Sequence, residues 1–323
     1  MGEILDDFCH TIVESEKFTE LEDEDKIDRV CDCARNSLSI YFVSSNIGNK
    51  YYVFILMFIS MVFDAGNFFT IAFFKGLQAH PMMLFMWISF ASFSLMWSLI
   101  MFTFVCNFSL DKVLAASCGM FTVESHWEFL KILMKVIPFQ VTFFNNMIIG
   151  LNICLSLDLI LTLRNPFMKS QSRYVTYVLI TLIVAAVPAF QRVVNQDTAK
   201  SQFTYGWIVV VIFFIYIVTA CYSIFFGMKF LFRPGISSEA RKMTMRRHVF
   251  YIAMNILCQV YNFLSRLETD IDPTLQYDHW CITTFAVFFF GQGIFLNIVR
   301  WFEPGYLEIV RNNLQLCQKK GDR

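Results

Sequence analysis

Residues 205–232 read YGWIVVVIFFIYIVTACYSIFFGMKFLF, a stretch in which Lys229 is the only charged side chain. A helix rises about 1.5 Å per residue, so about 20 apolar residues cross the roughly 30 Å hydrocarbon core of a bilayer. The stretch is long enough, and it lacks the polar stripe that marks a surface helix of a soluble protein. It therefore predicts a transmembrane helix.

The composition of the whole chain also indicates a membrane environment. Of 323 residues, 56% are hydrophobic and 16% are charged, whereas a typical soluble protein has about 25% charged residues. The mean hydropathy is +0.53. The 26 Lys and Arg residues balance the 26 Asp and Glu residues, so no net charge attracts a nucleic acid. We expect the lipid bilayer as a partner and no nucleic acid.

Six further stretches have the length and apolar character of a membrane span. The seven predicted spans are residues 51–74, 82–106, 132–163, 174–194, 205–232, 245–265 and 280–302. The connections are short, so we expect an all-α, polytopic membrane protein with one seven-transmembrane helix bundle over residues 51–302. Residues 1–50 form an acidic N-terminal segment. Residues 303–323 are expected to form a short amphipathic helix on the membrane, with Cys317 as a candidate for palmitoylation.

The charges of the loops predict the orientation. Basic residues gather in loops on the side of the C-terminus, and most acidic residues lie on the opposite side. Because basic loops stay in the cytoplasm, we expect the N-terminus outside the cell, the C-terminus inside, and location in the plasma membrane. Asn107 begins a glycosylation sequon on the predicted outer side. The cysteines expected there, which could form disulfides of undefined pairing, are Cys9, Cys31, Cys33, Cys118 and Cys281.

Motifs for catalysis are absent from the sequence. It contains no HExxH, GxSxG or Walker pattern, and its five His residues are scattered. The last predicted span lacks the Lys with which a microbial-type rhodopsin binds retinal. We therefore expect no enzyme activity, no catalytic residue, no metal site and no cofactor.

Polar residues inside the predicted spans are the best candidates for function, because they cost several kcal/mol in lipid unless they are paired. The candidates for an intramembrane polar switch are Asp64, Asn67, Asn152, Asp158, Gln292 and Asn297. Such residues are either static links between helices, worth about 0.6–2 kcal/mol each, or a two-state network that couples the two sides of the membrane. Asp64 is the strongest candidate, since a lone carboxylate needs a cation, a proton or several donors.

A second set of residues, toward the predicted outer side, could contact a ligand. These candidates are Gln140, Asn145, Trp207, Gln259, Asn262 and His279. Trp207 lies at the end of a span, where Trp also gathers for reasons unrelated to ligands. For Trp207 the interfacial interpretation is favoured, whereas Gln140 and Asn262 lie deeper.

Several of these residues lie in motifs that resemble those of G-protein-coupled receptors. Pro166 follows Asp158 by eight residues, similar to the Asp-Arg-Tyr motif and loop Pro of rhodopsin-like receptors, although Leu159 replaces the Arg. Gly66-Asn67 is similar to the Gly-Asn of their first helix. Gln292-Gly293, followed by Asn297-Ile298-Val299-Arg300, resembles a pattern in cyclic-AMP-receptor-like and secretin-like receptors. The chain thus resembles a divergent receptor of the cyclic-AMP-receptor-like or rhodopsin-like superfamily, or of an expanded chemoreceptor family.

The resemblance implies a receptor that binds an extracellular ligand of unknown type and signals through a heterotrimeric G protein. Anionic lipid headgroups would attract the same basic residues as a G protein. The candidates for G-protein contact are Arg164, Arg241, Lys242, Arg246 and Arg247. The alternative is a seven-helix transporter or channel-like protein that uses Asp64 as a cation or proton site. A structural membrane subunit without a ligand is the third possibility.

Overall fold

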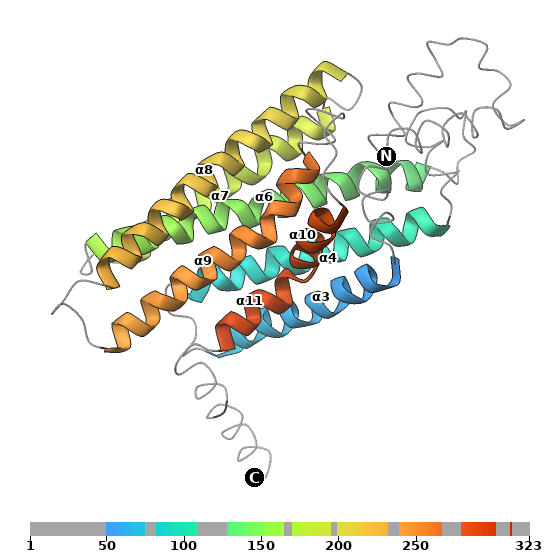
Figure 1. The fold of residues 1–323 in the computed structure, drawn as a ribbon. Coiled ribbons are helices and arrows are strands. Elements are labelled where there is room, and N and C mark those ends of the chain that lie inside the picture. The colour runs from blue at the N-terminus through green and yellow to red at the C-terminus, as the bar shows by residue number, and fades with distance from the viewer. Residues whose placement is uncertain are drawn as a thin grey trace, which may run out of the picture.

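The structure, a computed structural model, describes residues 50–74, 82–108, 128–164, 170–194, 199–231, 239–266, 279–301 and 311. Within these ranges every regular element is a helix (Figure 1), which confirms the all-α prediction. The helices are α3 (Lys50–Phe73), α4 (Met82–Phe108), α6 (Glu128–Arg164), α7 (Ser170–Val194), α8 (Ala199–Leu231), α9 (Glu239–Arg266), α10 (His279–Phe290) and α11 (Gln292–Trp301).

Five helices in the described part of the chain are long and apolar enough to cross a membrane. Their candidate spans are Tyr52–Phe73, Met82–Met101, Val136–Arg164, Arg173–Arg192 and Gly206–Phe230. The pair α10 and α11 is a sixth candidate if its bend of 62° lies within one span. The chain is therefore a polytopic helical membrane protein with five to six candidate spans, and the prediction of seven is not confirmed.

Helix α9 is the predicted span that is missing from the candidate spans of the structure. Its apolar part, His248–Leu264, is shorter than the spans of the five other helices. Residues 241–244, which precede the predicted span 245–265, belong with residues 245–247 to the first turns of α9. No Gly or Pro follows Gly235 before the apolar part begins, so nothing interrupts a helix there. The basic residues thus extend α9 without lengthening its apolar part.

The expected single helix over 280–302 is broken at Gly291. The Gly291 amide donates to the carbonyl of Val287 at 2.9 Å, and the amides of Ile294 and Phe295 donate to the carbonyl of Gly291 at 2.9 and 3.1 Å. A Cβ at Gly291 would lie 2.8 Å from the Val287 carbonyl oxygen and 2.9 Å from the Phe295 ring. Only glycine fits this bend, which directs α11 away from the axis of α10.

The helices form one elongated bundle, with α8 along the upper edge and α3 along the lower edge of Figure 1. Helix α3 packs against α4 and α11, α4 against α6, α6 against α7 and α8, and α8 against α9. Helix α9 packs against α10 and α11, which return to α3 and close a ring. Most of the apolar span of α6 is buried inside the bundle, whereas less than a third of the spans of α7 and α8 is buried. Helix α6 is therefore the central helix, and α7 and α8 are peripheral.

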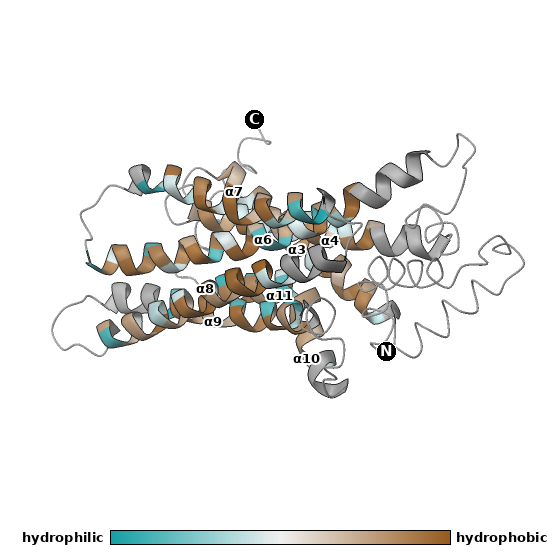
Figure 2. Cartoon of the chain, turned by 90° about the horizontal axis from the view of Figure 1, so that it is seen from above, coloured by the Kyte–Doolittle hydropathy of each residue, from teal (hydrophilic) through white to brown (hydrophobic). Residues whose placement is uncertain are grey.

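The peripheral helices present apolar side chains outward. Ile183 on α7 and Phe214 on α8 are 62% and 66% exposed, and Phe58 on α3 is 51% exposed. Figure 2 shows hydrophobic residues along most of the length of α7 and α8. Soluble monomers rarely expose contiguous apolar surface on this scale. A lipid bilayer accounts for these outward faces.

Helices α6 and α7 approach each other most closely at a small residue. A Cβ added to Gly150 would lie 3.1 Å from the Cα of Thr181 and 3.4 Å from the Cβ of Val184. Ala185 and Ala189 of α7 are fully buried. Small residues let membrane helices pack backbone to backbone, so α6 and α7 form a tight pair.

Candidate functional site

Polar groups of three helices meet around Asp64, which is 2% exposed. The hydroxyl of Ser92 on α4 donates to Oδ2 of Asp64 at 2.5 Å. The Gly293 amide on α11 donates to Oγ of Ser60 at 2.8 Å. Nδ2 of Asn297 donates to the Gly293 carbonyl at 2.6 Å. We call Ser60, Asp64, Ser92, Gly293 and Asn297 the Asp64 cluster.

The break at Gly291 brings the beginning of α11 to this cluster. A Cβ on Gly293 would overlap the Asp64 carboxylate and the Ser60 carbonyl oxygen, and would lie 2.6 Å from the Ser60 hydroxyl. Glycine is therefore the only residue that allows α11 to approach α3 in this way. The beginning of a helix carries partial positive charge, which favours a nearby carboxylate. Asp64 thus receives a hydrogen bond from α4 and lies beside the start of α11.

Further polar contacts connect the Asp64 cluster with its surroundings. Asn67, one turn along α3, donates from Nδ2 to the hydroxyl of Ser89 on α4. On the other side, Nε2 of Gln259 on α9 donates to Oε1 of Gln292 at 3.2 Å. Gln292 directly precedes Gly293, so α9 is joined to the helix that meets Asp64. Polar contacts thus connect α3, α4, α9 and α11 inside the bundle.

Arg300 lies two turns further along α11 and is 4% exposed. Its Cζ lies 4.7 Å from the centroid of the Phe85 ring, and Nη2 lies 3.5 Å from Sδ of Met82. The cation–π contact with Phe85 therefore holds the Arg300 guanidinium inside the bundle, against α4.

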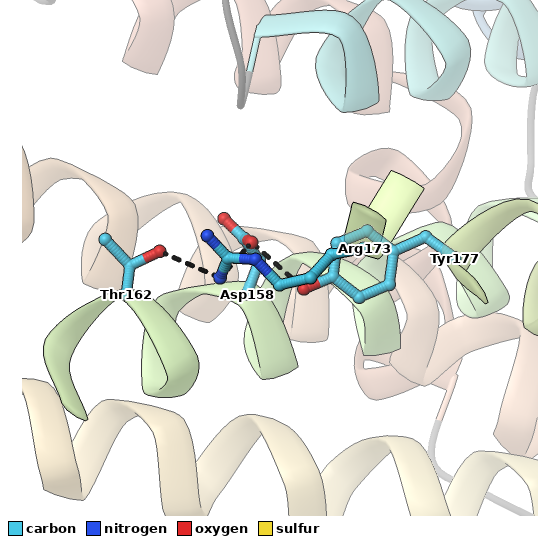
Figure 3. Close-up of polar contacts among 4 residues, drawn as sticks. All are labelled: Asp158, Thr162, Arg173 and Tyr177. Carbon is cyan, nitrogen blue, oxygen red and sulfur yellow. Dashed lines mark hydrogen bonds and ion pairs between the residues drawn. The ribbon is translucent and has the colours of Figure 1, made fainter. Parts of the chain in front are cut away.

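A second buried polar group joins α6 to α7 (Figure 3). Nη1 of Arg173 lies 3.0 Å from Oδ1 of Asp158, and the Tyr177 hydroxyl donates to the same oxygen at 3.0 Å. Nη1 of Arg173 also donates to Oγ1 of Thr162 at 3.4 Å. Asp158 is 4% and Arg173 8% exposed. We call Asp158, Thr162, Arg173 and Tyr177 the Asp158 cluster.

The six predicted switch residues are thus distributed over different contacts. Asp64, Gln292 and Asn297 lie in or next to the Asp64 cluster, and Asn67 lies one turn away. Asp158 is bonded to α7 instead. Asn152 donates from Nδ2 to the carbonyl of Ile148 on its own helix at 2.7 Å, which is a local contact.

The candidates for ligand contact occupy different environments. Gln140 accepts a hydrogen bond from Ser98 of α4 at 3.4 Å. Asn145, Gln259 and Asn262 are buried, whereas Trp207 is 47% exposed. His279 begins α10, and its side chain lies outside the described residues.

The candidates for contact with a cytoplasmic partner lie at helix ends. Arg164 ends α6, is exposed, and donates from Nη2 to the Tyr222 hydroxyl on α8 at 3.0 Å. Arg246 is exposed in α9. Arg241, Lys242 and Arg247 belong to α9, but their side chains lie outside the described residues.

Other predicted features cannot be placed. Asn107 belongs to the last turn of α4, and its side chain lies outside the described residues, as does that of Cys281 in α10. Cys9, Cys31, Cys33, Cys118 and Cys317 also lie outside the described residues, together with nearly all of the predicted amphipathic tail.

The sequence reasoning missed the partners of the two buried carboxylates. Ser60 and Asp64 are four residues apart on α3, and Ser89 and Ser92 are three apart on α4, so each pair shares a helix face. This spacing could have indicated hydroxyl donors for Asp64. Arg173 directly precedes the predicted span 174–194, whereas in the structure it begins the apolar span of α7.

The described residues contain no group of three or more His, Cys, Asp or Glu side chains that could hold a metal ion. No protein-family model matches the chain, and no curated protein matches it in sequence. The fold and these two polar clusters are therefore the basis for any assignment of function.

Proposed function

We propose that the chain is a seven-helix receptor that binds an extracellular ligand and signals through a heterotrimeric G protein. In this proposal α9 is a span, because its 28 residues extend about 42 Å at 1.5 Å per residue. Helices α10 and α11 form one bent span. The protein lies in the plasma membrane, with its N-terminus outside the cell and its C-terminus in the cytoplasm.

The observation that carries the proposal is the contact of Gln259 with Gln292. Gln259 is a ligand-contact candidate on α9, and Gln292 precedes the residues of α11 that meet Asp64. A ligand that displaces the Gln259 amide would change the position of the first turn of α11. Because the cluster is buried and joined to α3 and α4, such a change is transmitted through paired groups rather than through solvent.

At the end of α6 where Arg164 lies, the polar contact with α7 is stronger than the polar contact with α8. The Asp158 cluster ties α6 to α7 through a buried ion pair. The contact of Arg164 with Tyr222 on α8 is exposed, and exposed polar contacts contribute about 0–1 kcal/mol. In the active state of the proposed receptor, α8 therefore separates from the α6–α7 pair and opens a surface for the G protein.

The test of receptor function is nucleotide exchange on a co-expressed heterotrimeric G protein during a ligand-panel screen. We expect at least one ligand to raise the exchange rate, and a variant with Arg241, Lys242, Arg246 and Arg247 all replaced by Gln to lose most of the increase while still binding that ligand. A C-terminal tag should be inaccessible to antibody in intact cells. Exposure of that tag, or exchange that is independent of every ligand, would contradict the proposal.

The alternative, a transporter or channel-like protein, is favoured by one specific feature. Helix α11 begins next to Asp64 after a sharp bend, and broken helices whose ends meet a charged group are typical of transporter sites. In this alternative Asp64 carries a proton or another cation.

Transport predicts ion flux without any G protein. In proteoliposomes that contain a trapped pH-sensitive dye or radioactive sodium, the native chain should conduct one of the two ions, and Asp64→Asn should reduce the flux at least tenfold. Arg246→Gln, a change at an exposed position of α9, is the control. Equal flux in Asp64→Asn and the native chain would exclude Asp64 as the transport site.

A further inference from the structure

Two basic side chains lie at the same boundary of the apolar bundle. Arg164 is the last residue of the candidate span in α6, and Lys229 is the next-to-last residue of the span Gly206–Phe230 in α8. Both side chains are exposed. Because α6 packs against α8 and both spans end here, their charged groups lie at the depth of lipid headgroups rather than in the hydrocarbon.

The guanidinium of Arg164 is held in place by α8. Nη2 of Arg164 donates to the Tyr222 hydroxyl at 3.0 Å. Cζ of Arg164 also lies 5.5 Å from the centroid of the Phe226 ring, within the range of a cation–π contact. One side of the guanidinium is thus fixed, and a long side chain that would otherwise sample many rotamers is pre-oriented for a further acceptor.

Lys229 lies on the same face of α8 as these two aromatic residues. Tyr222, Phe226 and Lys229 are spaced by four and three residues, so they follow one another along the helix. Tyr222 is 46% exposed, and the neighbouring Phe225 is 66% exposed. The face is therefore an exposed strip with apolar rings toward the hydrocarbon and an ammonium group at its end.

These charges have no acidic partner in the described part of the chain. Its ion pair, between Asp158 and Arg173, involves neither Arg164 nor Lys229. A fixed guanidinium and an ammonium group on adjacent helices are complementary to a phosphate group, to which Arg can donate two hydrogen bonds. The Tyr222 hydroxyl accepts from Arg164 and can donate its own proton to the same phosphate.

We propose that Arg164, Tyr222 and Lys229 bind the phosphate group of a phospholipid between the ends of α6 and α8. The exposed ring of Phe225 and the half-buried ring of Phe226 contact its acyl chains. The site has a basic part at the depth of lipid headgroups and an apolar strip on α8. Only a lipid can occupy both, so the site favours a lipid over a soluble phosphate. The site belongs to the state described here, in which Arg164 of α6 contacts Tyr222 of α8, so in the proposed receptor it is present before α8 separates from α6.

The test is native mass spectrometry of the purified full chain in detergent, titrated with phosphatidylglycerol. Each basic residue near a headgroup contributes about a fivefold change in affinity, and the oriented Arg should contribute more. We expect Arg164→Gln to weaken binding about tenfold, Lys229→Gln about fivefold, and Arg164→Lys to give an intermediate loss because its charge remains without the planar geometry. Tyr222→Phe should cause a smaller loss while keeping the ring.

Arg246→Gln is the matched control, because Arg246 is also exposed and basic but lies on α9. Because an anionic headgroup is attracted to any exposed basic residue, this variant should weaken phosphatidylglycerol binding less than Arg164→Gln and less than Lys229→Gln. Thermal unfolding without added lipid identifies any variant whose fold has changed. If Arg164→Gln is such a variant, the lipid affinity of Arg164→Lys is compared with that of the native chain instead. Equal lipid affinity in Arg164→Gln, Lys229→Gln and the native chain would overturn the proposal. Equally tight binding of inorganic phosphate would overturn the assignment to a lipid.

Discussion

Gly293→Ala is expected to prevent α11 from packing on α3 and to lower the free energy of unfolding by about 3 kcal/mol. The added Cβ would overlap the Asp64 carboxylate and the Ser60 carbonyl oxygen. Neither group can move away cheaply, because Asp64 is held by Ser92 and the Ser60 carbonyl belongs to a helix backbone. The thermal midpoint of the detergent-solubilised chain, followed by size-exclusion chromatography after heating, measures the loss.

Gly66→Ala provides a matched control on α3. A Cβ at Gly66 meets no atom within 4 Å, and alanine is a better helix former than glycine by about 1 kcal/mol. This variant should therefore keep or slightly raise the thermal midpoint. Similar midpoints for Gly293→Ala and Gly66→Ala would show that α11 does not lie against Asp64 as described.

Arg173→Leu is expected to destabilise the chain by about 3–5 kcal/mol, since it leaves the Asp158 carboxylate buried without its cation. Tyr177 still donates one hydrogen bond to Asp158, but a single neutral donor does not replace a guanidinium. The loss should appear as a lower thermal midpoint and as faster proteolysis between α6 and α7.

The double variant Asp158→Leu with Arg173→Leu separates the cost of an unpaired charge from the contribution of the pair. Replacing both members of a buried ion pair by apolar residues is often neutral, so the double variant should recover much of the stability lost in Arg173→Leu. Arg246→Gln, at an exposed position, should change the free energy of unfolding by less than about 0.5 kcal/mol. A double variant no more stable than Arg173→Leu would contradict a direct pairing of Asp158 with Arg173.

The sequence predicted the helices well where apolar length decides the structure. The span expected at residues 82–106 corresponds to α4, and that at 174–194 lies within α7. Helices α6 and α8 begin earlier than predicted, at Glu128 and Ala199. Hydropathy marks the part of a helix that lipid can cover, whereas a helix itself continues until its backbone is interrupted. For this reason α6 and α8 begin before their predicted spans, and α9 begins with basic turns that are not apolar.

The break in the last span was not predictable from the sequence. Glycine occurs within many straight membrane helices, so Gly291 and Gly293 alone do not indicate a bend. The bend follows from contacts with Phe295 in the same span and with Ser60 and Asp64 on α3, which only the assembled bundle supplies. The importance of Asp64 could be inferred from its charge, but its donor on α4 and its close approach to α11 could not.

Asp158 illustrates how a resemblance can indicate a residue without its partner. The motif that Asp158 resembles has Arg at the next position, where this chain has Leu159. Leu159 is 7% exposed and packs in the apolar core. The cation comes instead from Arg173 on the following helix. A charge that is absent from one helix is thus supplied by its neighbour, which no local sequence pattern reveals.

The contact between Ser60 and Gly293 joins residues that are 233 positions apart. During synthesis, α3 therefore enters the membrane long before α11 exists, and Ser92 on α4 is the first partner that Asp64 can meet. A carboxylate at the centre of an unpartnered membrane helix costs about 2.5–3.5 kcal/mol. Closure of the ring is consequently a late step of biogenesis, and a chain that stops before α11 leaves Ser60 and Asp64 without the helix that packs against them.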